Sequence, residues 1–474
     1  SGSLSEPDLL ELAGTARLIL DELIKRQQGA FFAVSYERGR AILRRSAELI
    51  APKGALTEAV AGTLDRLAPP NVATLRATFG ELSAVLAAVV DHLAARPDLA
   101  ARQLLEEIVA WEADLAGPYD DAPGPNPADP QPTISRETLE RYLRSCVPGW
   151  EHTTVENFRR LPGGYSKITI LFDARDEARG RQSLVLRAAQ HGTPFFMDGA
   201  DIGAEFPALR YAFEHGVPVA EPIHVEEDPA RLGAKFLISS RAPGRNYGSV
   251  ISGAADLSPA LIRHLVGVLA RIHATPLDRA DPVFRRSHFA RWAEYRTLAE
   301  FAPAFVDYWT GIADRCNALS SPGIRRGLAW LRANPPESDQ PPVLVHGDFG
   351  LHNAMIDEGR VTAVLDWEAS HIGDPADEFF LFSHAVAGVV DRPTLMRWYE
   401  EAGGQKISAY RLRYFDVLNC LKGPIVGYGS LNLAERHPTS DIKVCLVGLQ
   451  YVALPLKSLN AMISLAESLP RGDG

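Results

Sequence analysis

Apolar residues recur at helical spacing through most of the first 117 positions of the chain. The first repeats are Leu9-Leu10-Leu12, Leu18-Ile19-Leu20 and Leu23-Ile24, and further helical stretches follow near 35–50, 55–67, 71–95 and 98–116. Prolines at positions 69, 70 and 97 separate these stretches, and Asn71 and Asp98 are the expected caps of the helices that follow them. The pattern predicts an all-α bundle of four or five antiparallel helices over residues 1–117.

Residues 118–134 differ in composition, because proline, glycine and aspartate replace the apolar repeat. Closely spaced prolines prevent both a packed helix and a central strand. We therefore expect a linker between two domains in this stretch.

Beyond the linker, helical and strand patterns are mixed. Helices are expected over 133–146, capped by Ser135 with Glu137 in the first turn, and over 204–215. Short apolar runs predict strands over 155–160, 168–174, 183–188, 217–225 and 235–240. Helices dominate from residue 259 onward, interrupted by strands at 343–345 and 361–365. This order predicts an α+β fold with a five-stranded antiparallel N-lobe over 135–241 and a helical C-lobe over 242–474.

Composition and charge exclude several classes of protein. Apolar residues make up 46% and charged residues 23% of the chain, which is typical of a globular protein. The net charge of −10 argues against a nucleic-acid-binding protein, which normally carries a basic surface. No apolar run reaches the roughly 18 residues of a membrane span, and the first residues do not resemble a signal peptide. We therefore expect a cytoplasmic protein with neither a nucleic acid nor a membrane as its partner.

The four cysteines are far apart and form no Cys-x-x-Cys pair. This spacing predicts reduced thiols rather than a disulfide framework or a zinc site.

The strongest functional signal lies near residue 350. A short apolar strand leads into His346-Gly347-Asp348, and Asn353 follows Asp348 by five positions. After a second apolar strand comes Asp366, thirteen positions beyond Asn353. Aspartate and asparagine are common in turns, so any one of them alone would be an ordinary turn residue. The ordered set of three, each next to a strand, is not explained in that way.

This set matches what the transfer of a phosphoryl group to a hydroxyl requires. A carboxylate has to orient and deprotonate the hydroxyl, and Asp348 suits that role. Hard oxygen ligands have to hold Mg²⁺ against the phosphates of ATP, and Asn353 and Asp366 suit that role.

The form His-Gly-Asp-Phe-x-x-x-Asn, followed by Leu-Asp-Trp-Glu and then Gly-Asp-Pro-Ala-Asp, resembles the aminoglycoside phosphotransferase and choline kinase family. The resemblance covers about residues 135–465 and implies a bilobal protein-kinase-like fold with ATP and Mg²⁺ as cofactors. By this resemblance Asp348 is the catalytic base, His346 supports the catalytic loop, and Asn353 and Asp366 bind the metal. Asp374 and Asp377 match family positions that brace the loop.

Nucleotide binding is expected in the N-lobe, first at a glycine-containing turn between two strands. Gly163, Gly164 and Ser166 lie in this turn, where backbone N–H groups can approach phosphate oxygens closely. A plain β-hairpin would use two glycines equally well, so the assignment depends on the position of the turn before the other motifs. Lys167, beside the glycines, is a competing phosphate contact.

A cation on the third strand is also expected to hold the phosphates. This strand carries Arg187 where a lysine is usual, and Glu205 on the following helix is its expected partner. Arginine keeps its charge and can grip a phosphate with two N–H groups, so the substitution is compatible with activity. An exposed strand-end charge and a solvated helix face are the alternatives for these two residues. Order along the chain alone places the adenine-binding hinge at 236–241, with Ser239 and Ser240.

The acceptor is less clearly indicated by the sequence. The substrate lobe is expected to use residues 255–340 and 376–465. Between 411 and 457, six basic residues face three acidic ones: Arg411, Arg413, Lys422, Arg436, Lys443 and Lys457 against Asp416, Glu435 and Asp441. This balance favours an anionic or apolar hydroxylated acceptor, such as a hydroxyacyl-CoA, over a polycation. An aminoglycoside-type antibiotic kinase is the alternative, and the aromatic residues Trp292, Tyr295, Tyr308 and Trp309 are expected in the core rather than in an acceptor wall.

Two other classes of protein are alternatives to a small-molecule kinase. A non-catalytic, nucleotide-binding regulatory module would explain the missing lysine and the extra helices, but the base and both metal ligands are intact. A protein kinase is not expected, because Trp-Glu follows Asp366 and no Ala-Pro-Glu segment comes after it. The N-terminal bundle carries no recognisable chemistry, and a homodimer contact, a cap over the active site and a partner site are all open for it.

Overall fold

The computed structural model describes residues 30–50, 54–67, 74–94, 96, 98–115, 134–161, 167–177, 179–189, 197–246, 257–436 and 442–472. The helix predicted near residues 9–24, the cap at Asn71, the proline-rich linker and the glycine turn at 163–164 lie outside these ranges. Within the described residues, no helix is long and apolar enough to span a bilayer.

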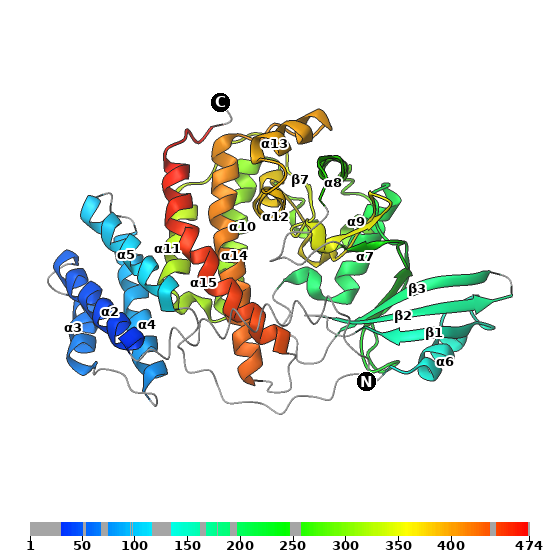
Figure 1. Ribbon diagram of the computed structural model, residues 1–474, viewed down its shortest axis with the longest axis horizontal. Coiled ribbons are helices and arrows are strands. Elements are labelled where there is room, and N and C mark those ends of the chain that lie inside the picture. Colours follow the sequence, from blue (N-terminus) through cyan, green and yellow to red (C-terminus); the bar gives the residue numbers. More distant parts are fainter. Residues whose placement is uncertain are drawn as a thin grey trace. The chain divides into compact units, whose positions relative to one another are not determined.

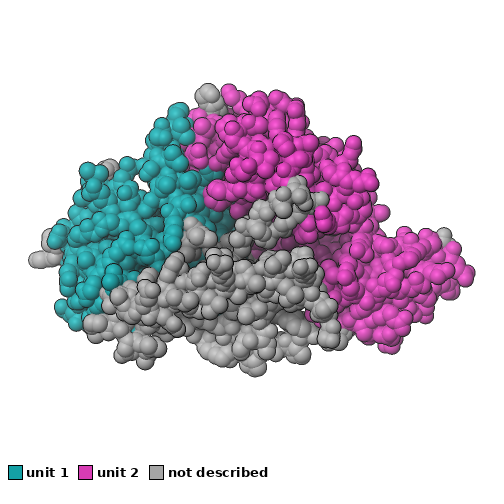
Figure 2. Space-filling model, viewed as in Figure 1, with its two compact units in different colours: residues 1–128, 303–335, 416–470 teal, residues 129–302, 336–415, 471–474 magenta. Residues whose placement is uncertain are grey.

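The chain forms two compact units, each assembled from separate stretches of sequence (Figure 2). Unit 1 contains residues 1–128, 303–335 and 416–470, and unit 2 contains residues 129–302, 336–415 and 471–474. The N-terminal helices therefore share a unit with two stretches that the sequence analysis places in the C-lobe. The predicted divisions at 1–117, 135–241 and 242–474 do not coincide with these units, and as functional divisions they stay predictions.

Unit 1 is helical, and its N-terminal helices match the predicted stretches. They are α2 (Ala30–Leu49), α3 (Ala55–Arg66), α4 (Leu75–Leu93) and α5 (Leu99–Leu115). Asp98 caps the start of α5, because its carboxylate accepts the Ala101 N–H at 2.9 Å, as predicted. Large buried side chains such as Phe79 and Trp111 fill the core between these helices. Helix α5 also packs against α11 (Pro322–Ala333) and α15 (Ile442–Glu467), so helices from the two ends of the sequence share one core.

Unit 2 begins with α6 (Arg136–Cys146) and a five-stranded sheet (Figure 1). Ser135 caps α6 as predicted, with Thr138 completing a capping box. The strands are β1 (Thr154–Arg160), β2 (Lys167–Asp176), β3 (Gly180–Ala189), β4 (Pro222–Glu226) and β5 (Phe236–Ser240). They lie in the order β1-β2-β3-β5-β4 with all neighbours antiparallel, which confirms the predicted N-lobe.

The strand predicted over 217–225 is shorter than expected. Gly216 has a φ of +74°, and the Val217 N–H donates to the Ala212 carbonyl, so these residues close α7 (Ile202–Glu214) instead. The strand β4 therefore begins only at Pro222.

The remainder of unit 2 combines helices with two small sheets. The helices are α8 (Pro259–His273), α9 (Pro282–Arg286), α12 (Phe379–Val386) and α13 (Arg392–Glu401). The strand β7 (Val343–Val345) pairs with β10 (His371–Gly373), and β8 (Ala354–Asp357) lies between β6 (Arg245–Asn246) and β9 (Arg360–Val364). The sequence predicted β7 and β9 but missed the other three, which are two to four residues long and too short for a periodic signal. Two further helices, α10 (Leu298–Arg315) and α14 (Ala409–Arg436), contain residues of both units.

Candidate active site

Asp348 lies in the loop that follows β7. Its side chain is 37% exposed, and each carboxylate oxygen has a polar neighbour. The Asn353 amide Nδ2 donates to Oδ2 at 3.0 Å and also to the Asp348 main-chain oxygen at 3.0 Å. His352 Nε2 lies 3.2 Å from Oδ1. The loop thus presents a carboxylate to solvent while two side chains hold its orientation.

His346 connects this loop to the end of β9. Its ring is fully buried, and Nε2 donates to the Leu365 carbonyl at 2.9 Å while Nδ1 accepts the Asp348 N–H at 3.3 Å. Burial lowers the pKa of His346, so the ring stays neutral and makes both bonds at once. The Leu365 N–H in turn donates to the Asn353 carbonyl at 2.7 Å. These bonds bring the segments that carry Asp348, Asn353 and Asp366 together, as the sequence predicts.

Asp366 is held in an unusual backbone conformation with a φ of +64°. Its Oδ1 accepts a charged hydrogen bond from Arg187 at 2.7 Å. Burial alone would raise the pKa of Asp366, but Arg187 and Lys167 outweigh it and hold that pKa well below its usual range. The carboxylate is therefore ionised.

Two cations and two further carboxylates form a cluster with Asp366. Arg187 donates to Glu205 Oε1 at 2.7 Å, so the predicted strand–helix ion pair is present in the structure. Lys167 Nζ lies 2.7 Å from Glu205 Oε2 and 2.6 Å from Glu368 Oε2. No role was predicted for Glu368, although it stands two residues after Asp366.

Glu378 fixes the backbone of the catalytic loop, a role that the sequence analysis missed. Its buried carboxylate accepts the Gly347 N–H at 2.8 Å and the Phe349 N–H at 3.2 Å. Burial raises the pKa of Glu378 to about 7, even though these N–H groups oppose the shift. Gly347 has a φ of +84°, and a Cβ there would lie 2.3 Å from the Ala369 carbonyl oxygen, so the position requires glycine.

The two aspartates predicted to brace the loop make other contacts. Asp374 forms a buried two-point ion pair with Arg411, at 2.9 Å for each nitrogen–oxygen contact. Asp377 Oδ2 lies 3.6 Å from His371 Nε2. Asp377 directly precedes Glu378 and Asp374 stands four residues before it, so the Gly-Asp-Pro signal lies in the segment that carries Glu378. Bracing of the loop by the two aspartates stays a prediction.

The remaining predicted nucleotide contacts are only partly described by the structure. Gly163, Gly164 and Ser166 lie outside the described residues. Ser239 and Ser240 are the last residues of β5, and the Ser240 hydroxyl accepts the Glu221 N–H at 2.9 Å; their role as an adenine-binding hinge stays a prediction.

Asn353 and Asp366 have the amide and carboxylate oxygens that Mg²⁺ prefers. Among the described residues, no three His, Cys, Asp or Glu side chains are grouped to hold a metal ion. A donor set of one amide and one ionised carboxylate suits Mg²⁺, which usually keeps several waters and binds substrate phosphates. The residues present therefore fit the predicted cofactor.

Residues of the predicted acceptor region require one correction to the charge balance. Arg411 is fully buried and neutralised by Asp374, and Asp416 is buried as well, so neither is counted toward the potential of an acceptor site. Trp292 and Trp309 are buried, as expected of core residues. Cys146, Cys316 and Cys420 are free thiols, which agrees with the predicted absence of disulfides for the described part of the chain.

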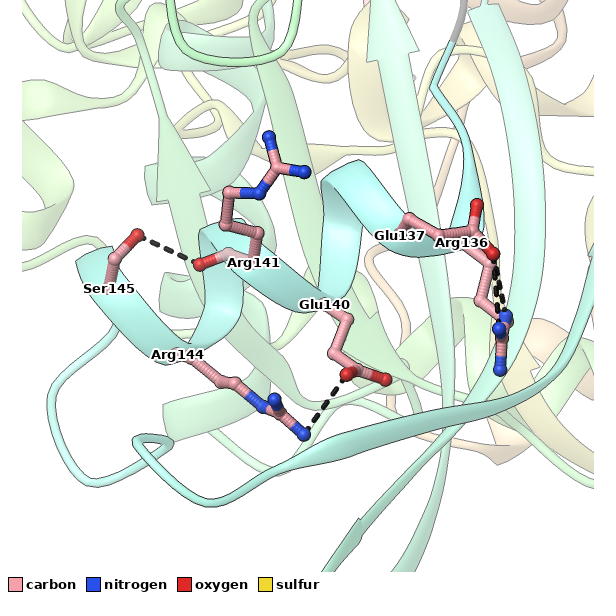
Figure 3. Close-up of a pocket in the computed structure, with 6 residues that line it drawn as sticks. All are labelled: Arg136, Glu137, Glu140, Arg141, Arg144 and Ser145. Atoms are coloured by element: carbon pink, nitrogen blue, oxygen red, sulfur yellow. Dashed lines mark hydrogen bonds and ion pairs between the residues drawn. The ribbon is translucent and has the colours of Figure 1, made fainter.

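A hollow of about 420 Å³ on the surface of α6 is lined by Arg136, Glu137, Glu140, Arg141, Arg144 and Ser145 (Figure 3). Its charges pair with one another, Arg136 with Glu137 at 3.1 Å and Arg144 with Glu140 at 3.0 Å. None of its lining residues belongs to the cluster around Asp348, so this hollow is not the candidate active site.

Comparison with known proteins gives several similarities. Rat (Rattus norvegicus) acyl-CoA dehydrogenase family member 11 is 29% identical over 255 residues, which is 52% of this chain and 31% of the relative. Hygromycin-B 4-O-kinase of Escherichia coli is 24% identical over 299 residues, 60% of this chain and 78% of the relative. The solved macrolide 2′-phosphotransferase of Brachybacterium faecium is 21% identical with a TM-score of 0.44, over 63% of this chain and 95% of that one.

The chain thus spans only about a third of the length of its acyl-CoA dehydrogenase relatives. A family model, in contrast, matches residues 157–414, which is more than half of the 474 residues and contains the entire cluster around Asp348. The chain belongs to the phosphotransferase enzyme family.

Proposed function

We propose that the chain is an ATP- and Mg²⁺-dependent kinase that phosphorylates a hydroxyl group of a small molecule. The observation that carries this proposal is the joining of three segments by the His346–Leu365 and Leu365–Asn353 hydrogen bonds, at 2.9 and 2.7 Å. These bonds bring together the candidate base and both candidate metal ligands. Family membership supports the same reaction type.

The chain's own groups have separable roles in this proposal. Asp348 orients the acceptor hydroxyl and takes its proton, since it is the exposed carboxylate of the loop. Asn353 and Asp366 hold Mg²⁺, which supplies positive charge to neutralise the phosphates. Arg187 is suited to the phosphates because it is partly exposed and keeps its charge. Gly163, Gly164 and Ser166 are proposed to cover the phosphates, and the backbone near Ser239 and Ser240 to bind adenine.

For the acceptor we propose an anionic or apolar hydroxylated molecule, with a hydroxyacyl-CoA as the first candidate. The relatives named for acyl-CoA support this class, although the chain covers only 31% of the rat protein. Without the buried Arg411 and Asp416, five basic residues remain against two acidic ones between 411 and 457. A polycation is poorly matched to that balance.

An antibiotic kinase is the second candidate, and a specific similarity favours it. The E. coli hygromycin-B 4-O-kinase is matched over 78% of its own length, a far larger share than for the acyl-CoA dehydrogenase relatives.

The test is ADP release with Mg²⁺ and ATP across a panel of hydroxyacyl-CoAs of several chain lengths, hygromycin B and a macrolide. Reactions without acceptor correct for ATP hydrolysis, and Asp348→Asn shows whether turnover depends on the proposed base. Turnover with a hydroxyacyl-CoA alone supports the first candidate, and turnover with an antibiotic alone replaces it with the second. ATP binding without ADP release from any acceptor refutes the kinase and favours a regulatory module.

A further inference from the structure

Glu205 is held by two cations from neighbouring strands. Lys167 is the first residue of β2 and lies opposite Ala189 in the sheet, whereas Arg187 on β3 lies opposite Thr169. Each cation takes a different oxygen of the Glu205 carboxylate, both at 2.7 Å. A single strand lysine would be sufficient to position this glutamate, so the second cation requires its own explanation.

The two cations differ in exposure and in their other partners. The Lys167 side chain is 3% exposed, and its ammonium group also lies 2.6 Å from Glu368. The Arg187 side chain is 21% exposed and reaches Asp366. Burial alone would lower the pKa of Lys167, but the carboxylates of Glu205, Glu368 and Asp366 together outweigh burial and raise that pKa, so the ammonium is charged. A buried ammonium held by two carboxylates is not available to a phosphate, whereas a partly exposed guanidinium is.

Glu368 connects Lys167 to the turn that carries Asp366. It lies two residues after Asp366, in the short η5 helix (Trp367–Ala369). The backbone of this turn is also tightly packed, since a Cβ on Gly199 would lie 2.2 Å from the Glu368 carbonyl oxygen. The Lys167 bridge therefore joins three elements: the start of β2, the helix α7 and the proposed metal-binding turn.

We infer that Lys167 is a positioning residue, and that Lys167 and Arg187 each perform one of the two roles usually combined in the strand lysine. The Lys167 bridge holds Glu205 and Glu368 in position, and Arg187 alone contacts the phosphates. When Arg187 moves from Asp366 and Glu205 toward the phosphates, Glu205 keeps an ion-pair partner, because Lys167 remains on its second carboxylate oxygen. This inference rests on the proposed function for the role of Arg187, but the Lys167 bridge itself is a property of the nucleotide-free protein.

The test compares Lys167→Met, Glu368→Gln, the double variant and wild type. Lys235→Met is the matched control, because Lys235 makes an exposed ion pair with Asp201 at 2.7 Å in the same lobe. Two measurements are made: the Tm without nucleotide, and the Kd of a fluorescent ATP analogue with Mg²⁺.

Lys167→Met should lower the Tm of the nucleotide-free protein by about 6–12 °C, because the buried Glu205 and the partly buried Glu368 lose a partner. Glu368→Gln in the same chain should restore at least about half of this loss, since it removes the unpaired charge. The Kd of the analogue should rise about tenfold in Lys167→Met, which corresponds to one misaligned contact of about 1.4 kcal/mol. Lys235→Met should change the Tm by less than about 2 °C.

A different pattern would overturn the inference. If Lys167 contacts phosphate directly, Lys167→Met weakens binding of the analogue but leaves the Tm of the nucleotide-free protein unchanged. Adding Glu368→Gln then restores nothing. If wild type does not bind the analogue at all, the proposed function fails. The Tm values of the single and double variants still test the Lys167 bridge in that case. If the Tm loss of the double variant equals the sum of the two single losses, Lys167 and Glu368 do not form the proposed bridge.

Discussion

Replacing Glu112 by glutamine should stabilise unit 1 at alkaline pH. Glu112 lies on α5, is 5% exposed and reaches the first turn of α11. Its carboxylate accepts the Gly323 N–H at 2.5 Å and the Tyr428 hydroxyl at 3.3 Å. Burial nonetheless dominates and raises the pKa of Glu112 to about 7 from the ordinary 4.5. A glutamine of the same shape keeps an acceptor for Gly323 and removes the cost of burying a charge.

The magnitude follows from proton linkage. The folded state of wild type binds a proton as the pH falls from about 7 to about 4.5, whereas the unfolded chain does not, so wild-type stability is lost as pH rises through this window. At about 1.4 kcal/mol per pKa unit, the full effect is about 3.5 kcal/mol. The advantage of Glu112→Gln in the free energy of unfolding should therefore be about 3 kcal/mol at pH 8 and fall to about 1 kcal/mol at pH 5.

The assay has to report on unit 1 alone, because the chain forms two compact units. Hydrogen exchange of peptides from α5 gives the local free energy of opening at pH 5, 6, 7 and 8, after correction for intrinsic exchange. Glu107→Gln is the control, since Glu107 lies on the same helix but is exposed and paired with Arg45. A Glu112→Gln difference that does not vary with pH, or a variant less stable than wild type at pH 8, would refute the reasoning.

Three further predictions concern the catalytic loop. Asp348→Asn should lower kcat by about 10²–10⁴-fold through loss of the base, with the Kd for ATP changed less than about twofold in a binding titration. Glu378→Gln should lower the Tm and reduce kcat about tenfold, because the NH₂ of the glutamine side chain would be placed against a backbone N–H of Gly347 or Phe349, and two donors cannot bond each other. Unchanged kinetics would contradict the bracing role. Gly347→Ala should cost at least about 2 kcal/mol in urea unfolding, from the positive φ and the clash with the Ala369 carbonyl, and a wild-type midpoint would contradict this.

Local chemistry explains why much of the site was predictable. The loop around Asp348 and Asn353 and the turn at Asp366 each follow a short apolar strand, so their side chains and spacing are written in contiguous sequence. Caps such as Ser135 and Asp98 depend on neighbours three residues away. The five strands followed from period and turn residues, whereas their order in the sheet did not, because β3 pairs with the more distant β5 rather than with β4.

Distant contacts were not predictable in the same way. No sequence signal distinguished Glu378, which bonds the loop, from Asp374, which pairs with Arg411, because both are acids in one short segment. His352 was visible in the motif, four residues after Asp348, but its contact with that carboxylate depends on the shape of the loop. The charge of Arg411 was counted as available until the fold showed it buried.

The sequence by itself determined the reaction chemistry that the chain can support and the helices and strands that carry it, because those depend on residue types within a few positions of one another. Only the tertiary structure decided that Lys167 and Arg187 share Glu205, and that the N-terminal helices pack on α11 and α15. The physical reason is that ion pairs and shared cores are set by distance in space. Residues as far apart as Lys167 and Glu368, 201 positions from each other, meet only once the chain has folded.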